Sequence, residues 1–418
     1  MDLLRFITAG SVDDGKSTLI GRLMYDSKNI LIDQLEQLEK QSKNKNKQAG
    51  EIDLALLTDG LRAEREQGIT IDVAYRYFST PKRKFIIADA PGHVQYTRNM
   101  ITGASNANLI IILIDARQGV VEQTRRHSII ASLLKIPHVV VAINKMDLVE
   151  FSQDVFNNIV IDYTKVAQQL GLQDITYVPI SALLGDNIVD RSQHMDWYDG
   201  ESLLDLLEEV EIENDLNLTN SRFQVQFVIR PQTDDLHDYR GYAGKVISGI
   251  YKKGDKVKVL PQGIETSISK LEIAGKEVDE VFAPQSVVIH LTEDIDISRG
   301  DSIVKTDDHL VVSNEASVLL CWMDEKPLQA GNKYYLQQNS RLVRSVIKSI
   351  DYKIDVNTLS HQPVEGGVKL NEVVKATIKA ASPLVFDSYN RISANGSAIL
   401  VDETSNSTVA AVLFQEPD

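Results

Sequence analysis

The sequence predicts an α/β domain built on a mostly parallel, doubly wound sheet, followed by two all-β barrel domains. Near-continuous apolar runs alternate with helical patterns in the first half, and a glycine-rich loop follows the first run directly. From about residue 222 onward, short strand-like stretches recur at close spacing with glycine turns, which is typical of small barrels. We expect domains at residues 1–213, 222–312 and 313–418, with 213–221 as a polar linker.

Composition limits the classes of function. The chain has 418 residues, too many for one hydrophobic core, and a net charge of −15, which argues against a nucleic-acid partner because phosphates are contacted by Lys and Arg. No apolar run approaches the length of a membrane span, and we expect neither a membrane association nor a cleaved signal. Cys321 is the only cysteine, so no disulfide forms within the chain, and we expect a cytoplasmic location.

The glycine-rich loop is the stretch 10–18, GSVDDGKST, which fits the P-loop pattern. An apolar strand, 6–9, leads into the loop and a helix, 19–23, leads out of it, as the motif requires. The glycines let successive N–H groups point at a phosphate, reinforced by the positive end of the helix. We expect Lys16 to reach the β- and γ-phosphates and the Ser17 hydroxyl to ligate Mg²⁺. The predicted loop residues are Gly10, Ser11, Val12, Asp13, Asp14, Gly15, Lys16, Ser17 and Thr18.

A second motif follows the short buried strand 85–88 and consists of Asp89, Ala90, Pro91, Gly92 and His93. We expect Asp89 to hold Mg²⁺ through water and the Gly92 N–H to sense the γ-phosphate, since a residue without a side chain permits close approach. A lone histidine is more often a packing residue than a catalytic one. Because His93 directly follows this motif, we interpret it as the residue that orients the attacking water.

Thr70, in the stretch 67–71, is the candidate switch threonine, which would close on Mg²⁺ and the γ-phosphate only in the triphosphate state. A threonine in such a run is usually just a strand residue, but its position between the first two motifs favours the switch. The lysine-rich run 40–47 is interpreted as a solvated loop rather than a nucleic-acid patch, because it lacks aromatic partners.

A third motif follows the apolar strand 139–143 and consists of Asn144, Lys145, Met146 and Asp147. The Asp147 carboxylate can accept hydrogen bonds from the ring N–H and the exocyclic amine of guanine. Adenine presents neither donor on that edge and would leave the carboxylate unpaired, at a cost on the order of several kcal/mol. Lys145 can lie over the base, and Asn144 can tie this loop to the P-loop.

A fourth motif, Ser181, Ala182 and Leu183, follows the strand 176–180 and could meet guanine O6 through a backbone N–H. Four motifs in this order, each at the end of a predicted strand, predict a domain that binds GTP with Mg²⁺. An ATPase with a chance NKMD sequence is the disfavoured alternative. Among these residues, His93, Lys16 and Thr70 are the expected catalytic set, and Ser17, Thr70 and Asp89 (through water) are the expected metal ligands.

Longer stretches extend these motifs: GSVDDGKSTLIGRL, ALLTDGLRAEREQGITIDVAYRYFST, APGHVQYTRNM, DARQGVVEQTRRHS and INKMDLV, with RGYAG and DIDISRGD later. On these residues the chain resembles the translation-factor class of GTPases. Within that class it is most similar to the GTPase subunits of heterodimeric bacterial sulfate adenylyltransferases. Elongation factors of the Tu type usually carry a histidine where this P-loop has Asp14.

The resemblance implies a partner: a smaller catalytic subunit that binds ATP and sulfate and forms adenylyl sulfate with release of pyrophosphate. This chain would couple GTP hydrolysis to that uphill step of sulfate assimilation, in a heterodimer or a higher assembly. No arginine finger is identifiable, so unassisted turnover is expected to be slow, of order 10⁻⁴ to 10⁻² s⁻¹. The alternative is an elongation-factor-like carrier of aminoacyl-tRNA, against which the acidic charge balance argues.

Overall fold

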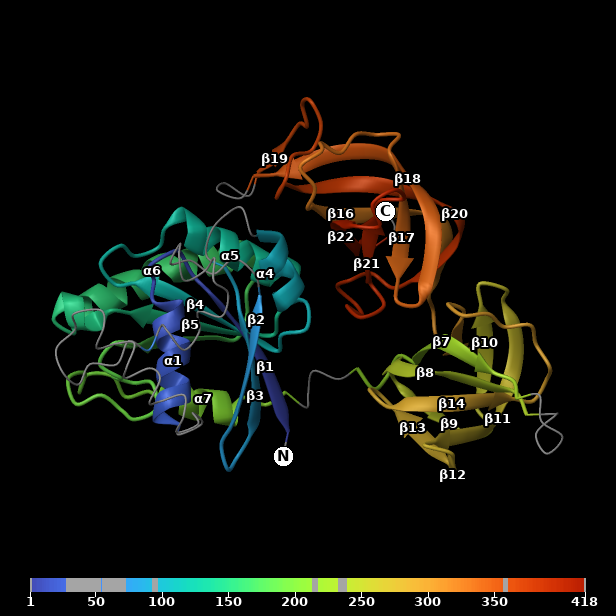
Figure 1. Cartoon of the computed structure of the whole chain (residues 1–418), viewed down its shortest axis with the longest axis horizontal. Helices are drawn as coiled ribbons and strands as arrows, with labels where there is room; N and C mark the ends of the chain where they lie inside the picture. The colour runs from blue at the N-terminus through green and yellow to red at the C-terminus, as the bar shows by residue number, and fades with distance from the viewer. Residues whose placement is uncertain are drawn as a thin grey trace. The chain divides into compact units, whose positions relative to one another are not determined.

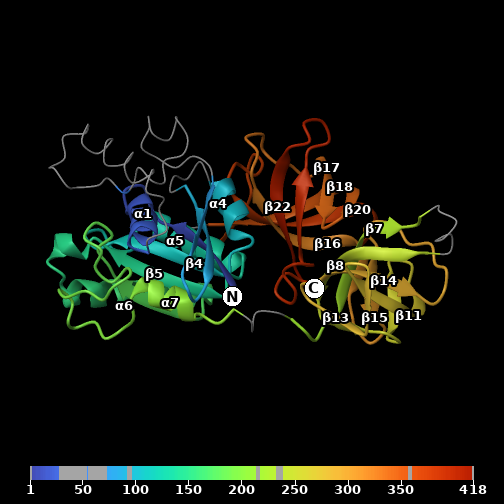
Figure 2. The same ribbon diagram turned by 60° about the horizontal axis from the view of Figure 1, so that its bottom comes forward.

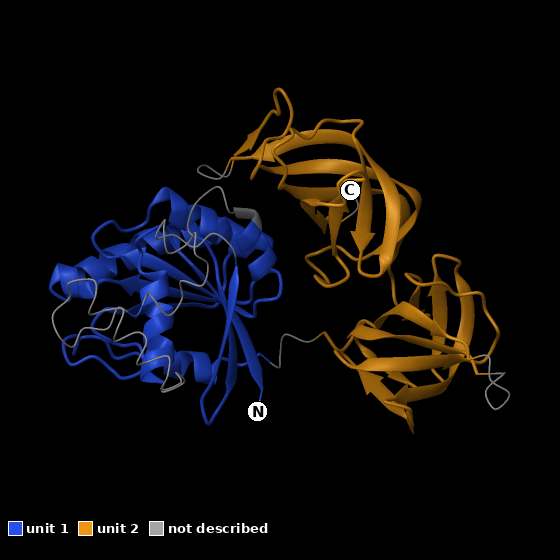
Figure 3. Ribbon diagram, viewed as in Figure 1, with its two compact units in different colours: residues 1–212 blue, residues 213–418 orange. Residues whose placement is uncertain are grey.

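In the computed structural model, the described residues are 2–27, 54, 73–91, 97–212, 217–231, 239–355 and 360–416. They form two compact units, Met1–Ile212 and Glu213–Asp418, coloured separately in Figure 3. The predicted site residues Thr70, Gly92 and His93 lie outside the described residues. Among the helices described, none combines the length and the apolar character needed to cross a membrane.

The first unit is organised around a six-stranded sheet with the order β2-β3-β1-β4-β5-β6. Four of its five pairings are parallel, and only the edge strand β2 runs antiparallel to its neighbour β3. The predicted, mostly parallel sheet is therefore confirmed. Its strands are β1 (Leu3–Ala9), β2 (Ala74–Ser79), β3 (Lys84–Asp89), β4 (Leu109–Asp115), β5 (His138–Asn144) and β6 (Ile175–Pro179).

Helices lie on both faces of this sheet (Figures 1 and 2). On one face, Leu19 and Leu23 of α1 and Leu207 of α7 share a buried core with alternate residues of the strands. The remaining residues of β4 point the other way and are buried too, as expected of a strand covered on both sides. The helices are α1 (Lys16–Asp26), α4 (Thr97–Ala104), α5 (Glu122–Leu133), α6 (Gln153–Leu170), α7 (Leu203–Glu209) and the short 3₁₀ helix η3 (Met146–Val149).

The last helix of this unit is shorter than the sequence indicated. The acidic, amphipathic pattern of residues 201–211 predicts a helix over that whole stretch, whereas α7 spans Leu203–Glu209. Ser202 is the N-cap, because its side-chain oxygen accepts a hydrogen bond from the Asp205 N–H, and Val210 already has an extended conformation. The capping residue therefore defines the start of this helix better than the charge pattern does.

The second unit consists of two closed barrels, as predicted. In the first barrel, six strands follow the order β10-β15-β7-β8-β14-β11, and a pairing between β10 and β11 closes the ring. Its strands are β7 (Arg222–Ile229), β8 (Gly241–Ser248), β9 (Ile250–Lys252), β10 (Lys256–Leu260), β11 (Ile264–Ile273), β12 (Lys276–Val278), β13 (Glu280–Phe282), β14 (Ser286–Leu291) and β15 (Ser302–Lys305).

In the second barrel the order is β17-β21-β22-β16-β20-β18, closed by a pairing between β17 and β18. Each barrel has its own buried apolar core, and the second is centred on Trp322, Leu320 and Phe414. Closure leaves no long free strand edge in either ring. The strands are β16 (Val311–Trp322), β17 (Lys333–Gln338), β18 (Arg341–Ile354), β19 (His361–Gln362), β20 (Val373–Phe386), β21 (Ser397–Val401) and β22 (Thr408–Phe414).

Candidate nucleotide-binding site

The described parts of the predicted motifs meet at one edge of the six-stranded sheet. The glycine-rich loop begins where β1 ends, Asp89 ends β3 and Asn144 ends β5, while Ser181 comes two residues after β6. Because these four strands are parallel, their carboxyl ends lie side by side at the edge where ligands bind in open α/β sheets. Asp115, the last residue of β4, lies at this edge too.

The glycine-rich loop has a conformation that depends on Gly15. This residue caps α1 in the left-handed region, with φ of 93°, and a Cβ atom there would come within 2.5 Å of Asn144 Nδ2. Inside the loop, the buried Asp14 carboxylate accepts a hydrogen bond from the Ser11 N–H. Burial raises the pKa of Asp14. Because of this close contact, a side chain at position 15 would push the P-loop away from Asn144.

Lys16 is the most unusual group of the loop because its ammonium is buried. Its Nζ donates to the backbone oxygens of Gly10 at 2.8 Å and Ser11 at 2.7 Å. Burial lowers the pKa of Lys16, while the charges of nearby Asp89 and Asp14 act in the opposite direction. A buried cation whose described hydrogen-bond partners are neutral carbonyls is well suited to receive an anion such as a polyphosphate.

The proposed Mg²⁺ ligands are a hydroxyl and a carboxylate, and both types of oxygen suit this hard cation. Ser17 lies in the first turn of α1, half-buried like its neighbours Val12 and Thr18. Asp89 is buried at the end of β3, where its Oδ1 accepts a hydrogen bond of 3.4 Å from the Thr8 hydroxyl. The donor chemistry of Ser17 and Asp89 thus fits Mg²⁺. Ala90 and Pro91 follow Asp89 and are buried.

Asn144 joins the two halves of the site. Its Nδ2 donates to the backbone oxygen of Asp14 at 2.7 Å, and its Oδ1 accepts from the Ala182 N–H at 2.9 Å. The predicted link between this loop and the P-loop is therefore present, and it extends to the fourth motif. Because Asn144 already engages the Ala182 N–H, guanine O6 could use that donor only by sharing it.

Asp147 is held in place by the fourth motif. The Ser181 hydroxyl donates to Asp147 Oδ1 at 2.7 Å and accepts from the Leu184 N–H at 3.2 Å. The preceding residue, Met146, is fully buried, and its N–H donates to the backbone oxygen of Ile180 at 3.2 Å. Leu183 is 61% exposed. The orientation of the half-buried Asp147 carboxylate is thus fixed by the chain itself.

Asp115 and Arg117 were not predicted to belong to the site. Lys145 Nζ donates to the backbone oxygen of Asp13 and, at 2.9 Å, to Asp115 Oδ2. The Arg117 guanidinium donates two hydrogen bonds to the same carboxylate, of 3.0 and 2.6 Å. Burial opposes ionisation of Asp115, but the hydrogen bonds from Arg117 and Lys145 prevail and lower its pKa. The sequence signal was an acidic residue that ends a buried strand, as Asp89 does.

These loops and the barrels that follow define a GTP-binding protein of the elongation-factor type. The family model for the elongation factor Tu GTP binding domain matches residues 1–213, and the model for the GTP-eEF1A C-terminal domain-like family matches residues 315–414. Among solved structures, Sup35 complexed with GDP aligns with all of this chain and 94% of its own at 20% identity, with a TM-score of 0.45.

Curated relatives show which family of the elongation-factor class the chain belongs to. The sulfate adenylyltransferase subunit 1 of Bacteroides fragilis is 53% identical over 409 residues, covering 98% of this chain and 85% of that protein. The protein of the same name from Cellvibrio japonicus is 52% identical over 415 residues, covering 99% and 87%. The chain belongs to the family of sulfate adenylyltransferase subunit 1.

Proposed function

We propose that this chain is the GTPase subunit of a cytoplasmic sulfate adenylyltransferase. A separate, smaller subunit binds ATP and sulfate and forms adenylyl sulfate and pyrophosphate, and GTP hydrolysis on this chain is coupled to that reaction. The observation that carries the proposal is identity above 50% along nearly the whole chain to proteins named sulfate adenylyltransferase subunit 1, together with intact base and phosphate loops. The aminoacyl-tRNA carrier weighed from the sequence is not favoured by these relatives.

Guanine is recognised by the residues of the third and fourth motifs. Asp147 accepts from the two donors on the guanine edge, Lys145 lies along the base, and the loop 181–183 faces O6. Three polar side chains on this side are already fixed by hydrogen bonds to neighbours: Asn144 to Asp14, Lys145 to Asp115 and Asp147 to Ser181. Fixed partners reduce the ordering entropy lost on binding and so favour selectivity for GTP.

The triphosphate is bound by the loop 10–18, where Lys16 and the backbone amides meet the negative charge that moves during hydrolysis. Ser17, Asp89 (through water) and, in the triphosphate state, Thr70 would hold Mg²⁺, which would neutralise negative charge on the phosphates. His93 orients the attacking water. Closure of Thr70 on the γ-phosphate distinguishes the GTP state from the GDP state.

The coupling is tested with the smaller ATP-binding subunit purified together with this chain. Addition of ATP and sulfate is expected to raise GTP turnover above the rate of the isolated chain, because the partner's substrate state controls hydrolysis. Omission of sulfate is the matched control. GTP turnover that is unchanged by partner, ATP and sulfate would contradict the coupling.

Replacement of His93 by Ala tests the proposed role of hydrolysis. We expect GTP turnover to fall about a hundredfold or more, the typical effect of losing a group that positions or deprotonates the attacking water, with GDP affinity unchanged. Adenylyl sulfate synthesis should fall in parallel. The exposed His309→Ala variant is the matched control. Full sulfate activation in the His93→Ala protein would mean that the chain acts as a GTP-binding scaffold.

A further inference from the structure

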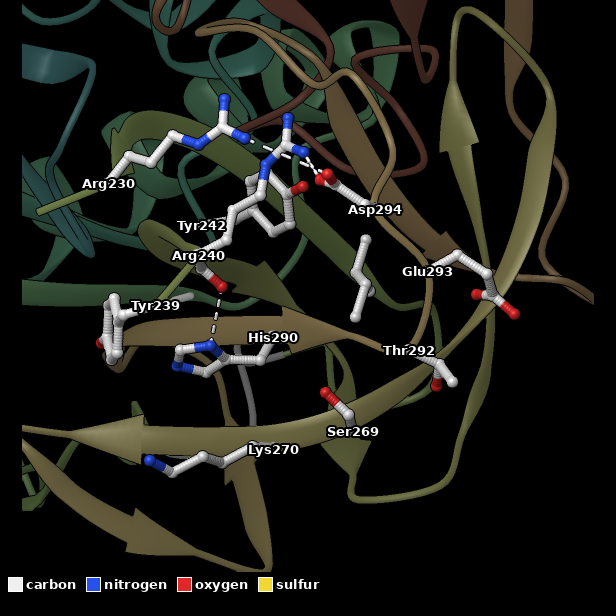
Figure 4. Close-up of a pocket in the computed structure, with 11 residues that line it drawn as sticks. Arg230, Tyr239, Arg240, Tyr242, Ser269, Lys270, His290, Thr292, Glu293 and Asp294 are labelled. Carbon is white, nitrogen blue, oxygen red and sulfur yellow. Dashed lines mark hydrogen bonds and ion pairs between the residues drawn. The ribbon is translucent and has the colours of Figure 1, made fainter. Parts of the chain in front are cut away.

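The first barrel carries a cavity of about 470 Å³ that no part of the GTP site uses (Figure 4). It is lined by residues from the end of β7, the start of β8, the middle of β11 and the loop after β14. The volume is in the range of small-molecule sites. Its lining is unusually polar for such a site, with the cationic side chains of Arg230, Arg240 and Lys270 and the acidic side chains of Glu293 and Asp294, which indicates a charged ligand.

Two of these cations converge on one carboxylate. Arg230 and Arg240 both approach Asp294, the former at 4.0 Å, as Figure 4 shows. The Asp294 side chain is 70% exposed, whereas that of Arg240 is only 18% exposed. Asp294 thus lies between two guanidinium groups, where an anionic ligand would bind. Because Asp294 is exposed, water weakens its ion pairs with the two arginines.

Arg240 is itself fixed and incompletely satisfied. Its guanidinium lies over the Tyr242 ring at 5.9 Å from the centroid, a cation–π contact that orients the group. Its Nε is buried and has no hydrogen-bond partner among the described residues. Buried donors are nearly always paired, so an unpaired one beside a cavity points to a partner that arrives with a ligand.

Lys270, the third cation of the lining, is paired with a carboxylate beside the cavity. Glu272 is buried and accepts a 2.8 Å hydrogen bond from the Tyr239 hydroxyl, and Lys270 pairs with it. His290 Nδ1 donates to the Arg240 backbone oxygen at 2.7 Å, and this hydrogen bond fixes the backbone at Arg240. Gly241 allows the close packing, since a Cβ atom there would lie 3.2 Å from the rings of both His290 and Tyr239. Lys270 is thus committed to the buried Glu272, whereas the described ion-pair partners of the two arginines are the exposed carboxylates of Asp294 and, at 3.9 Å from Arg240, Asp296.

We propose that this cavity is a binding site for a small ligand that presents a phosphoryl or sulfuryl group to Arg230 and Arg240. The oxyanion displaces Asp294 from between the two guanidinium groups, whose planar donors match its oxygens better than an ammonium would. The proposal involves no residue of the first unit and does not depend on the GTPase function. Sulfate and phosphate esters are also the chemistry of the proposed enzyme, which suggests the probes.

The test measures binding of inorganic sulfate, inorganic phosphate and AMP to the full chain by calorimetry, at constant ionic strength. Saturating Mg²⁺ and a non-hydrolysable GTP analogue fill the base position and all three phosphate positions, so the first unit does not contribute. We expect saturable binding of at least one probe, weakened at least tenfold in the Arg230→Gln/Arg240→Gln double variant. Comparison of the sulfate and phosphate arms shows which group the site prefers.

Two further variants make the test specific. Asp294→Asn removes the displaced carboxylate and should strengthen binding at least threefold, and its exposed position makes a folding defect an improbable cause of a gain. Arg344→Gln is the matched control, because Arg344 also lies over a tyrosine ring, at 5.7 Å, and approaches Glu403 at 3.6 Å on the other barrel. It should bind like the parent chain. Absence of saturable binding to both the parent and Asp294→Asn, or equal binding by the double arginine variant, would overturn the proposal.

Discussion

The two ends of the proposed GTP site differ in how their polar groups are paired within the chain. At the base end, Asn144, Lys145 and Asp147 are each hydrogen-bonded to a neighbour at 2.7 to 2.9 Å. At the phosphate end, the hydrogen bonds of the buried Lys16 ammonium to described residues go to two neutral backbone oxygens, at 2.8 and 2.7 Å. The polar groups of the base end are fixed by hydrogen bonds to their neighbours, whereas burial lowers the pKa of Lys16 and favours an anionic partner.

This difference assigns separate tasks to the two ends. A template that is already hydrogen-bonded selects the base, because a wrong base leaves its fixed groups unpaired. The buried Lys16 ammonium, whose burial penalty the charges of Asp89 and Asp14 offset only in part, supplies affinity for the phosphates, because a bound polyphosphate would offset that penalty further. Variants at the two ends should therefore have opposite effects on the stability of the free protein.

The largest expected effect is at Lys16. Lys16→Met keeps the length of the side chain but removes the charge, and we expect GTP affinity to fall at least about a hundredfold, since an unpaired buried charge typically accounts for 3–5 kcal/mol. Without nucleotide, the variant should melt at the same temperature as the parent or higher, because no ammonium is buried. Lys165→Met, with a side chain 66% exposed, is the control. A variant that binds GTP normally but melts at a lower temperature than the parent would mean that Lys16 stabilises the fold and does not bind the phosphates.

Next in size is the effect at Asp147. Asp147→Asn exchanges an acceptor for a donor, and we expect GTP affinity to fall about a hundredfold, equivalent to about 3 kcal/mol. Xanthosine triphosphate carries an oxygen in place of the guanine amine, so its affinity should rise in the same variant. Competition binding with both nucleotides measures the exchange. Unchanged preference for GTP would show that Asp147 does not contact the base.

A smaller effect is expected at Asp115, which sharpens the description of the base end. Asp115→Asn loosens Lys145, and we expect nucleotide affinity to fall about tenfold, the loss of one charge-assisted hydrogen bond, with turnover of bound GTP unchanged. Arg117→Gln leaves the hydrogen bond between Lys145 and Asp115 intact, so it should lower nucleotide affinity less than Asp115→Asn does. If the Arg117 variant lost as much affinity as the Asp115 variant, Arg117 itself would be the nucleotide contact.

The smallest effect concerns the body of the first unit. His127 on α5 is buried, and its pKa is lowered by burial to about 3, so only the unfolded state, with an ordinary pKa near 6.5, takes up a proton between these values. The unfolded state binds more protons in this window, so stability falls as pH falls from about 6.5 toward 3. At pH 5, the His127→Gln variant should lose less of its free energy of unfolding than the parent does, by on the order of 1 kcal/mol.

That measurement requires a signal from the first unit alone. Trp197 and Trp322 are the two tryptophans of the chain, so a Trp322→Phe background reports on Trp197. Trp197 packs against Phe156 of α6 in the first unit. His309→Gln, at an exposed position, is the control. Equal acid sensitivity in the His127 variant and its parent would mean that this imidazole does not resist protonation.

The base and phosphate loops could be predicted because each is a short motif directly after a buried strand, and parallel strands bring their ends together. Asp115 could not, because its role depends on a bond to Lys145, 30 residues away, and on Arg117. The length of α7 was missed because its start is set by the Ser202 cap. The barrel cavity was missed because Arg240, Lys270 and Asp294 meet only through the pairing of β14 with β8 and with β11.

The central claim is that the loops at this edge of the sheet bind guanine and a triphosphate. Competition between GTP and ATP for the purified chain in the presence of Mg²⁺ tests it most directly. We predict that GTP binds at least about a hundredfold more tightly, because adenine leaves Asp147 unpaired. Equal or tighter binding of ATP, or no binding of either nucleotide, would contradict the account.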